Sequence, residues 1–308
     1  MKKTIVIVTT ACAALLYSCA QDAKIGAPIP VEPDYALPQV GAPQAVNDRI
    51  VKLFNDYGSY FLYDLTQKDF EWTVSTGFSN SQIDSIVLGN PAYVGPLLDF
   101  LENIWLRHVP ENMKKGMGIP YRVFLVDAIR RFRVGYPPGM EYYYSNYKVT
   151  GKSIAFAGVN EAFGQMTAAE KTTRKNELVG AIFDYYASVG LISFPEAFYA
   201  ISNYATNPTV TPVNVNFPDR VEAYLQAGFL PGSYGAVNPN YWLSNAYMWT
   251  NARSNDFSSF RMHLFQRTDE QMTPYLSYPL IKQKFDLLVD HFRNEYGIDV
   301  RGIANAAF

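Results

Sequence analysis

A long helical pattern between Thr167 and Leu191 constrains the fold of this chain more than any other segment. Thr167 and Glu170 have the spacing of a capping box, which predicts that a helix begins at this point. In the stretch AIFDYYASVGL (181–191), apolar side chains recur at three- and four-residue spacing, without a proline. One carboxylate, Asp184, interrupts this apolar and aromatic pattern. The segment therefore predicts a buried helix with an unexplained acidic residue.

Shorter patterns on both sides of this helix alternate between helical and strand periodicity. They indicate an α+β domain without an internal repeat, and residues 203–239 are rich in loop-forming residues. We expect helices over 47–57, 96–109, 255–265 and 280–296, strands over 59–65, 70–74 and 121–129, and a hairpin-like pair over 141–159 that turns at Thr150-Gly151.

The composition is that of a globular protein with no bias toward a polyanionic partner. The 308 residues are 48% hydrophobic and 15% aromatic, and the net charge is −2 with a pI near 6.0. The chain is long enough for one large core or two smaller cores. Because a strong positive charge is absent, we expect no nucleic-acid partner.

The N-terminus has the pattern of an export signal. Lys2 and Lys3 precede an apolar stretch that is too short to span a bilayer and that ends in LYSC. This ending resembles a bacterial lipoprotein box, which implies a signal peptide over 1–18 and a lipid anchor on Cys19. An ordinary signal peptide with an incidental cysteine is the alternative. Cys12 would leave with the signal, so the mature chain would contain a single cysteine.

A proline-rich segment follows Cys19 and predicts a tether over residues 19–45. In the extended polyproline form it would reach ~75 Å at ~3.1 Å per residue. We expect the folded domain to occupy residues 46–308 and to be held at the bacterial cell envelope, at the surface or periplasmic face of the outer membrane.

Several short motifs, in this order along the chain, resemble one family of lipoproteins. The family is that of the Bacteroidetes substrate-import-associated zinc metallohydrolases, or zinc-binding metallopeptidases, and the resemblance covers nearly the whole chain. It implies a zincin-like fold. The segments that carry it are LFNDYGSYFLYDL, GKSIAFAGVN, FPEAFYAISNY, AGFLPGSYG, SNDFSSF and IKQKFDLLVDHFRNEYGIDV.

The resemblance places the zinc-binding His-Glu-x-x-His motif of the family on residues 183–187. Here the two histidine positions hold Phe183 and Ala187, and the glutamate position holds Asp184. The family's downstream Glu-Asp-Phe-Ala-Glu motif matches Asn255, Asp256, Phe257, Ser258 and Ser259.

These departures remove the chemistry of the motif. Two imidazoles one helical turn apart, with a third ligand, hold zinc, and the metal activates a water for the glutamate. Phe183 and Ala187 have no donor atom, and Ser259 offers only a neutral hydroxyl. We therefore expect no zinc, no cofactor and no catalytic residue. Asp184 is then the remnant of a catalytic base position. It is either a hydrogen-bonded carboxylate in a partly wet groove or, as the alternative, a residue with a catalytic role.

The histidines offer little for a replacement metal site. His108 lies at an expected helix end, His263 follows Ser259 by four residues, and His291 shares a helix face with Glu295. No two histidines belong to one motif, although a new zinc site or a Ser-His-Asp triad stays open as an alternative.

The stretch NYWLSNAYMW is a second candidate for binding. Tyr241, Trp242, Tyr247 and Trp249 would form an aromatic platform for sugar rings or for a partner, and core packing is the alternative interpretation.

Taken with the resemblance, these features predict a lipid-anchored pseudo-metallopeptidase. Its expected role is to bind a peptide or glycan, or to act as an accessory component of an outer-membrane nutrient-uptake system of the SusC/SusD type. That last association is implied by the resemblance alone. The alternatives are an active zinc-dependent peptidase or hydrolase with an atypical site, and a purely structural subunit of a transport complex.

Overall fold

A computed structural model describes residues 32–71, 84–150, 153–209, 218–232, 249 and 251–308. Residues 37–308 form a compact unit, and all residues of the described hydrophobic core belong to it. The expected signal peptide over 1–18 and the expected anchor Cys19 lie outside the described residues.

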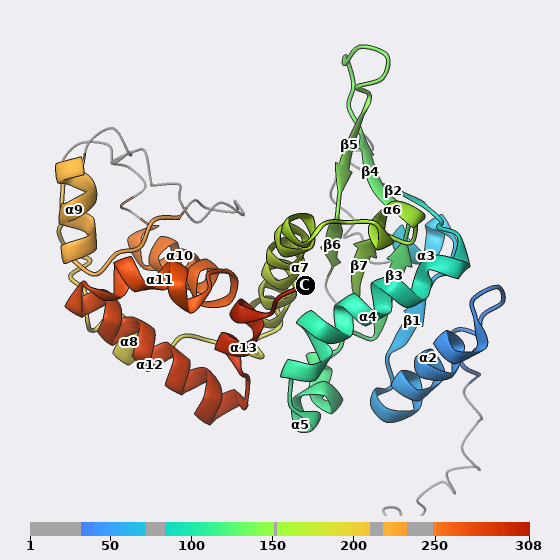
Figure 1. Cartoon of the computed structure of the whole chain (residues 1–308), viewed down its shortest axis with the longest axis horizontal. Coiled ribbons are helices and arrows are strands. Elements are labelled where there is room, and N and C mark those ends of the chain that lie inside the picture. Colours follow the sequence, from blue (N-terminus) through green and yellow to red (C-terminus); the bar gives the residue numbers. More distant parts are fainter. Residues whose placement is uncertain (1–31, 72–83, 151–152, 210–217, 233–248, 250) are drawn as a thin grey trace, which may run out of the picture. The chain divides into compact units, whose positions relative to one another are not determined.

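The N-terminal half of the unit contains a four-stranded mixed sheet (Figure 1). Its strand order is β1-β3-β7-β6, in which the first three strands are parallel and β6 runs antiparallel to β7. Its inner strands are apolar and buried after their first residues, Arg122 and Ser153, as is typical of strands that are covered on both faces. The strands are β1 (Tyr60–Leu62), β3 (Arg122–Val126), β6 (Tyr147–Thr150) and β7 (Ser153–Ala157).

A three-stranded antiparallel sheet continues from two of these strands. Its order is β2-β4-β5, with β2 (Asp84–Val87), β4 (Ala128–Phe132) and β5 (Tyr142–Ser145). Asp127 separates β3 from β4, and Asn146 separates β5 from β6. Figure 1 shows β4 and β5 running side by side away from the four-stranded sheet.

Helices cover the sheet and build the C-terminal half of the unit. Helix α7 packs against β6 and against α10, and the latter also packs against α12 and α13. The helices that matter below are α2 (Gln44–Tyr57), α4 (Val94–Ile104), α6 (Glu161–Gly164), α7 (Ala168–Ser188), α8 (Glu196–Tyr199), α9 (Pro218–Gln226), α10 (Ala252–Gln266), α11 (Asp269–Leu276), α12 (Pro279–Tyr296) and α13 (Val300–Asn305).

The predicted α+β class is confirmed, together with most of the predicted elements. The capping box at Thr167 is present, with reciprocal bonds between the Thr167 and Glu170 side chains and the backbone. The hairpin-like pair corresponds in part to β6 and β7, whose turn at 151–152 lies outside the described residues. The start of the predicted pair, residues 142–145, forms β5 in the other sheet. The predicted helices correspond to α2, α4, α7, α10 and α12.

Three predictions need correction. Residues 67–71 form the short helix α3 (Gln67–Glu71), so that Phe70 and Glu71 are not in the expected strand, whose remainder lies outside the described residues. Helix α9 lies inside the stretch expected to be loops, and the single strand expected over 121–129 is interrupted at Asp127. Helix α3 has only five residues, and Phe70 is buried in it. In so short an element, alternating polar and apolar residues do not distinguish a strand from a helix.

The last part of the expected tether belongs to the compact unit. The Tyr63 hydroxyl donates to the carbonyl oxygen of Gln39 at 2.8 Å, and the Tyr63 N–H donates to the Gln39 side chain at 2.9 Å. Within the described ranges, none of the helices is long and apolar enough to cross a bilayer.

Candidate functional site

Phe183 occupies the first predicted zinc position and is part of the core. Its side chain is buried, and its ring stacks on Phe265 of α10 with 3.6 Å between the ring centroids. Phe292 of α12 and Tyr186 meet the same ring edge-on. Such stacking fills the space densely, so this position offers neither a donor atom nor room for a metal ion.

Asp184, the predicted base position, lies at the surface in an ion pair. Its side chain is 50% exposed and contacts the guanidinium of Arg261, which is 16% exposed. Arg261 also lies over the ring of Phe257, at 5.6 Å from the centroid. Asp184 is therefore a half-exposed carboxylate with a charged partner. The neighbouring Ala187 is half-buried and contributes no polar side-chain atom.

The downstream predicted positions surround a different, very small cavity. Asn255, Asp256 and Ser259 line a space of about 10 Å³ together with Trp249 and residues of α9 and the following loop. Ser259 packs closely on Gly232, where an added Cβ would lie 2.4 Å from the serine oxygen. Phe183 and Asp184, in contrast, meet α10 at Phe265 and Arg261. These contacts do not bring the two groups of predicted residues together.

Asp256 forms a fully buried ion pair with Lys284 of α12. The Lys284 amine lies 2.7 Å from the carboxylate, and the side chains are 0% and 1% exposed for Lys284 and Asp256 respectively. Tyr204 donates to the same carboxylate oxygen, and Lys284 also donates to the carbonyl of Gly228 at 2.9 Å. Burial raises the pKa of Asp256, against the opposing effect of Lys284, and burial also lowers the pKa of Lys284. The pair is therefore costly to keep charged, as expected for ions removed from water.

The three histidines are separate from each other and bonded to the backbone. His108 contacts the carbonyl of Asn103 at 3.0 Å, and His263 contacts that of Pro231 at 2.7 Å. His291 contacts the carbonyl of Ser193 at 2.9 Å. Across the part of the chain that the structure describes, no three His, Cys, Asp or Glu side chains are grouped so that they could hold a metal ion.

The aromatic platform can be followed only in part. Trp249 packs edge-on against Phe229 and Tyr224, with centroids 5.2 and 6.1 Å apart. This packing agrees with the core interpretation for Trp249. The other predicted members, Tyr241, Trp242 and Tyr247, lie outside the described residues.

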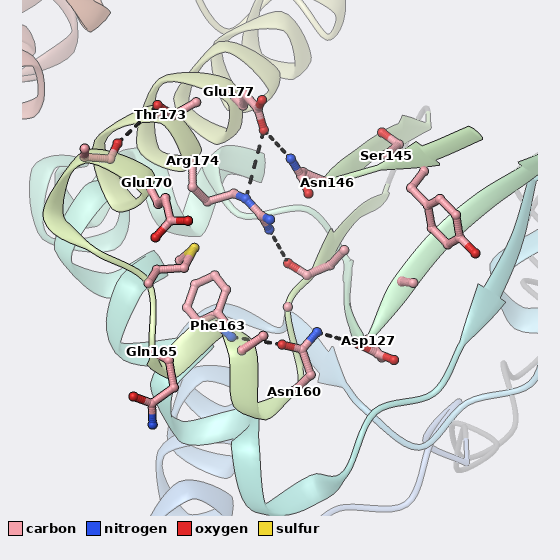
Figure 2. Close-up of a pocket in the computed structure, with 17 residues that line it drawn as sticks. Asp127, Ser145, Asn146, Asn160, Phe163, Gln165, Glu170, Thr173, Arg174 and Glu177 are labelled. Atoms are coloured by element: carbon pink, nitrogen blue, oxygen red, sulfur yellow. Dashed lines mark hydrogen bonds and ion pairs between the residues drawn. The ribbon is translucent and has the colours of Figure 1, made fainter. Parts of the chain in front are cut away.

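A large pocket lies elsewhere, between α7, α6 and the junctions of the two sheets (Figure 2). Its volume is about 750 Å³, within the range of pockets that hold small ligands. The lining is mixed, with Tyr144, Phe163 and Met166 as the larger apolar side chains. Its polar side chains are Asp127, Ser145, Asn146, Asn160, Gln165, Glu170, Thr173, Arg174 and Glu177.

Two planar pairs of polar side chains orient each other in this pocket. The Asn146 amide donates to the Glu177 carboxylate, and the Asn160 amide donates to the Asp127 carboxylate (Figure 2). Asn160 also caps α6, because its side-chain oxygen accepts from the Phe163 N–H at 2.9 Å. In each pair the amide donates to one of the two carboxylate oxygens, and this bond restricts the orientation of both groups.

Arg174 supplies the positive charge of the pocket. Its guanidinium donates to the carbonyl of Ala157 at 3.0 Å and lies 4.0 Å from Glu177. Burial lowers the pKa of Arg174, against the opposing effect of Glu177. Because the lining holds Asp127, Glu170 and Glu177 against this single arginine, the pocket favours acceptance of hydrogen bonds from a neutral or cationic ligand.

Sequence reasoning missed this pocket because its residues come from separate segments. The only local signal is a polar residue where a strand pattern is interrupted, Asp127 in LVDAI and Asn146 in YSNY. Both mark the points at which one sheet passes into the other.

No protein-family model matches the chain, and no curated protein matches it. Among solved structures, the chain is similar to a protein from Bacteroides caccae that is named, provisionally, a zinc-binding metallo-peptidase. The identity is 13% and the TM-score is 0.47, over 86% of this chain and 92% of the other.

Proposed function

We propose that this protein is a non-catalytic binding component of the bacterial cell envelope, and that its ligand site is the pocket between α7 and the strand junctions. The observation that carries the proposal is the pair of pre-oriented amide–carboxylate groups, Asn146 with Glu177 and Asn160 with Asp127, in a pocket of about 750 Å³. Fixed polar groups of this kind give specificity at little entropic cost.

The ligand that best fits these groups is a glycan. Sugar hydroxyls both donate and accept, so they match carboxylates, amides and one guanidinium side by side. Tyr144, which is 61% exposed, provides apolar surface for the face of a sugar ring. A peptide is the alternative ligand. Its charged or apolar side chains would make fewer hydrogen bonds to the carboxylates and amides of the pocket.

The absence of catalysis in the proposal rests on the environment of the predicted zinc helix. Phe183 stacks in the core at a position that would need an imidazole, and Asp184 is neutralised by Arg261. A metal-bound water is what a carboxylate base acts on in such sites. Metal analysis of protein purified without chelator tests this part of the proposal. About one zinc per chain after dialysis would favour the active-peptidase alternative.

The remaining parts of the proposal concern the location and the partners. A lipid on Cys19 would hold the domain at the membrane, and a SusC/SusD-type transport complex would receive the ligand. A Cys19→Ala variant is expected to leave the membrane fraction, because acyl chains supply the anchoring energy.

Ligand binding is tested by titrating the chain with oligosaccharides prepared from starch, xylan and chitin, and with a tryptic digest of casein, by isothermal calorimetry. Saturable binding of an oligosaccharide is expected. Glu177→Gln should weaken it at least about tenfold, because a hydrogen bond to a charged group is lost. Thr172→Ala is the matched control, since Thr172 is exposed on the same helix and does not line the pocket. Binding of the peptides alone, or equal effects of both variants, would contradict the glycan site.

A further inference from the structure

The hairpin formed by β4 and β5 exposes an unusual amount of apolar surface. It runs out from the four-stranded sheet in Figure 1. Exposed apolar patches of this kind usually mark an interaction site. The exposed fractions are 51% for Phe132, 73% for Val134, 52% for Tyr136, 63% for Met140, 36% for Tyr142, 52% for Tyr143 and 61% for Tyr144.

The exposed side chains lie on both faces of the hairpin. Phe132 is directly opposite Tyr142, and Arg131 is opposite Tyr143, so neighbouring positions point to opposite faces. Phe132, Tyr142 and Tyr144 share one face, where the rings contact each other. A protein partner laid against a sheet covers one face. Apolar side chains on both faces and around the turn instead favour an apolar environment that surrounds the tip on all sides.

Charge is arranged in a belt behind an uncharged tip. Residues 134–140 contain no charged side chain. Arg130 and Arg131 lie on β4, and Arg133 directly follows the end of this strand. Arg130 lies over Tyr142 at 4.7 Å from the ring centroid, and Arg133 lies over Tyr143 at 5.2 Å. The nearby acid, Glu141, accepts from the N–H of Gly139 at 2.6 Å and is thereby engaged in the turn.

We propose that the tip of this hairpin inserts into the interface of an anionic lipid membrane. Tyrosine is favoured at the level of the headgroups, and arginines behind an apolar tip are placed to bind lipid phosphates. The insertion would orient the domain on the membrane to which the proposed lipid anchor ties it, so the inference rests on the proposed envelope location. Tyr144 lines the pocket and is not part of the inserted tip, so the inference does not depend on the glycan site.

The test uses the full lipid-anchored chain in vesicles of phosphatidylethanolamine and phosphatidylglycerol at a 3:1 ratio. Because Cys19 is the only cysteine of the mature chain and would be acylated, Met140→Cys can be labelled selectively with an environment-sensitive dye. Glu295→Cys, exposed on α12, is the matched control. We expect a blue shift and quenching by nitroxide-labelled lipids for the dye at position 140, and neither for the dye at position 295.

The charge belt is tested in the same labelled chain. Arg130→Gln and Arg133→Gln should each lower the ratio of inserted to free tips about fivefold, since a basic residue near an anionic surface contributes about 1 kcal/mol. Arg131 is left unchanged because it pairs with Asp84. Phosphatidylcholine vesicles should reduce insertion similarly.

Two outcomes would overturn the proposal. One is a dye at position 140 that stays in water on the anionic vesicles while the chain is anchored. The other is a blue shift that arises only in native envelope membranes and disappears when their proteins are digested, which would assign the hairpin to a protein partner. Glycan binding is measured separately on the same chains, so failure of insertion and failure of the pocket remain distinguishable.

Discussion

Two carboxylates of the predicted degenerate site, Asp184 and Asp256, have opposite surroundings. Asp184 is half exposed and pairs with Arg261 at the surface, whereas Asp256 is 1% exposed and pairs with Lys284 among aromatic rings. The rings of Phe198 and Phe229 lie 4.9 and 4.7 Å from the lysine amine. The same carboxylate group is therefore expected to affect stability differently at these two positions.

The difference is one of solvation. An exposed ion pair exchanges water for a partner with little net gain, while a buried pair must offset the loss of water from both ions. Asp184 is thus expected to be nearly neutral for stability, and Asp256 to be tolerated only together with Lys284. The predictions below test this contrast.

The largest effect is expected when one member of the buried pair is removed. Lys284→Met should lower the free energy of unfolding by about 3–5 kcal/mol, because the Asp256 carboxylate would stay buried without its cation. Adding Asp256→Leu and Tyr204→Phe should restore most of the loss, since the carboxylate and the hydroxyl of this cluster are then removed and only the Gly228 carbonyl has lost its donor. Urea denaturation of the triple variant and of Lys284→Met measures the loss of stability and its recovery. A three-fold variant no more stable than the single one would show that the ion pair itself is stabilising.

Phe183→His should cost about 1–3 kcal/mol, since a polar ring would replace a buried one without a hydrogen-bond partner. The same urea series measures it, with Phe183→Leu as an apolar control. A histidine variant as stable as the leucine variant would show that position 183 still has access to water or to a polar partner.

A third carboxylate, Asp84, tests the intermediate case. Its side chain is 9% exposed and contacts both Arg131 and Lys148. Burial alone would raise the pKa of Asp84, but hydrogen bonds from Arg131 and Lys148 lower it overall. Its contribution to stability is therefore present above the unfolded-state pKa of about 3.9 and is lost as the pH falls through the lower folded-state pKa.

Asp84→Asn should flatten the acid side of the stability profile. Thermal unfolding between about pH 5 and about pH 2 should show a smaller drop in Tm for this variant than for the parent chain. Asp290→Asn, at an exposed position of α12, serves as the control and should leave the slope unchanged. Equal slopes for all three chains would mean that Asp84 is not coupled to its basic partners.

The smallest effect is expected for Asp184→Asn. Loss of a half-exposed ion pair should change the free energy of unfolding by less than about 1 kcal/mol, and added salt should reduce the difference further. Urea denaturation at low and high salt measures it. A loss as large as that of Lys284→Met would remove the contrast between the two regions.

The sequence by itself determined the local elements of this protein. The capping box at Thr167, the apolar periodicity of α7 and α12, and the strand patterns of β6 and β7 depend on residues close together in the chain. Such patterns follow from the geometry of helices and strands and need no knowledge of the topology. The helical positions of Phe70 in α3 and of α9 among loop-forming residues were missed because short elements carry weak periodicity.

Only the tertiary structure decided the surroundings of the candidate residues. Nothing local to Asp256 indicates that Lys284 will neutralise it, or that Asp184 will meet Arg261. The pocket likewise depends on Asp127 and Asn146, at two sheet junctions, facing side chains of α6 and α7. These meetings are set by strand pairing and helix packing between segments far apart in the sequence, so the burial and charge of each site follow from the assembled fold.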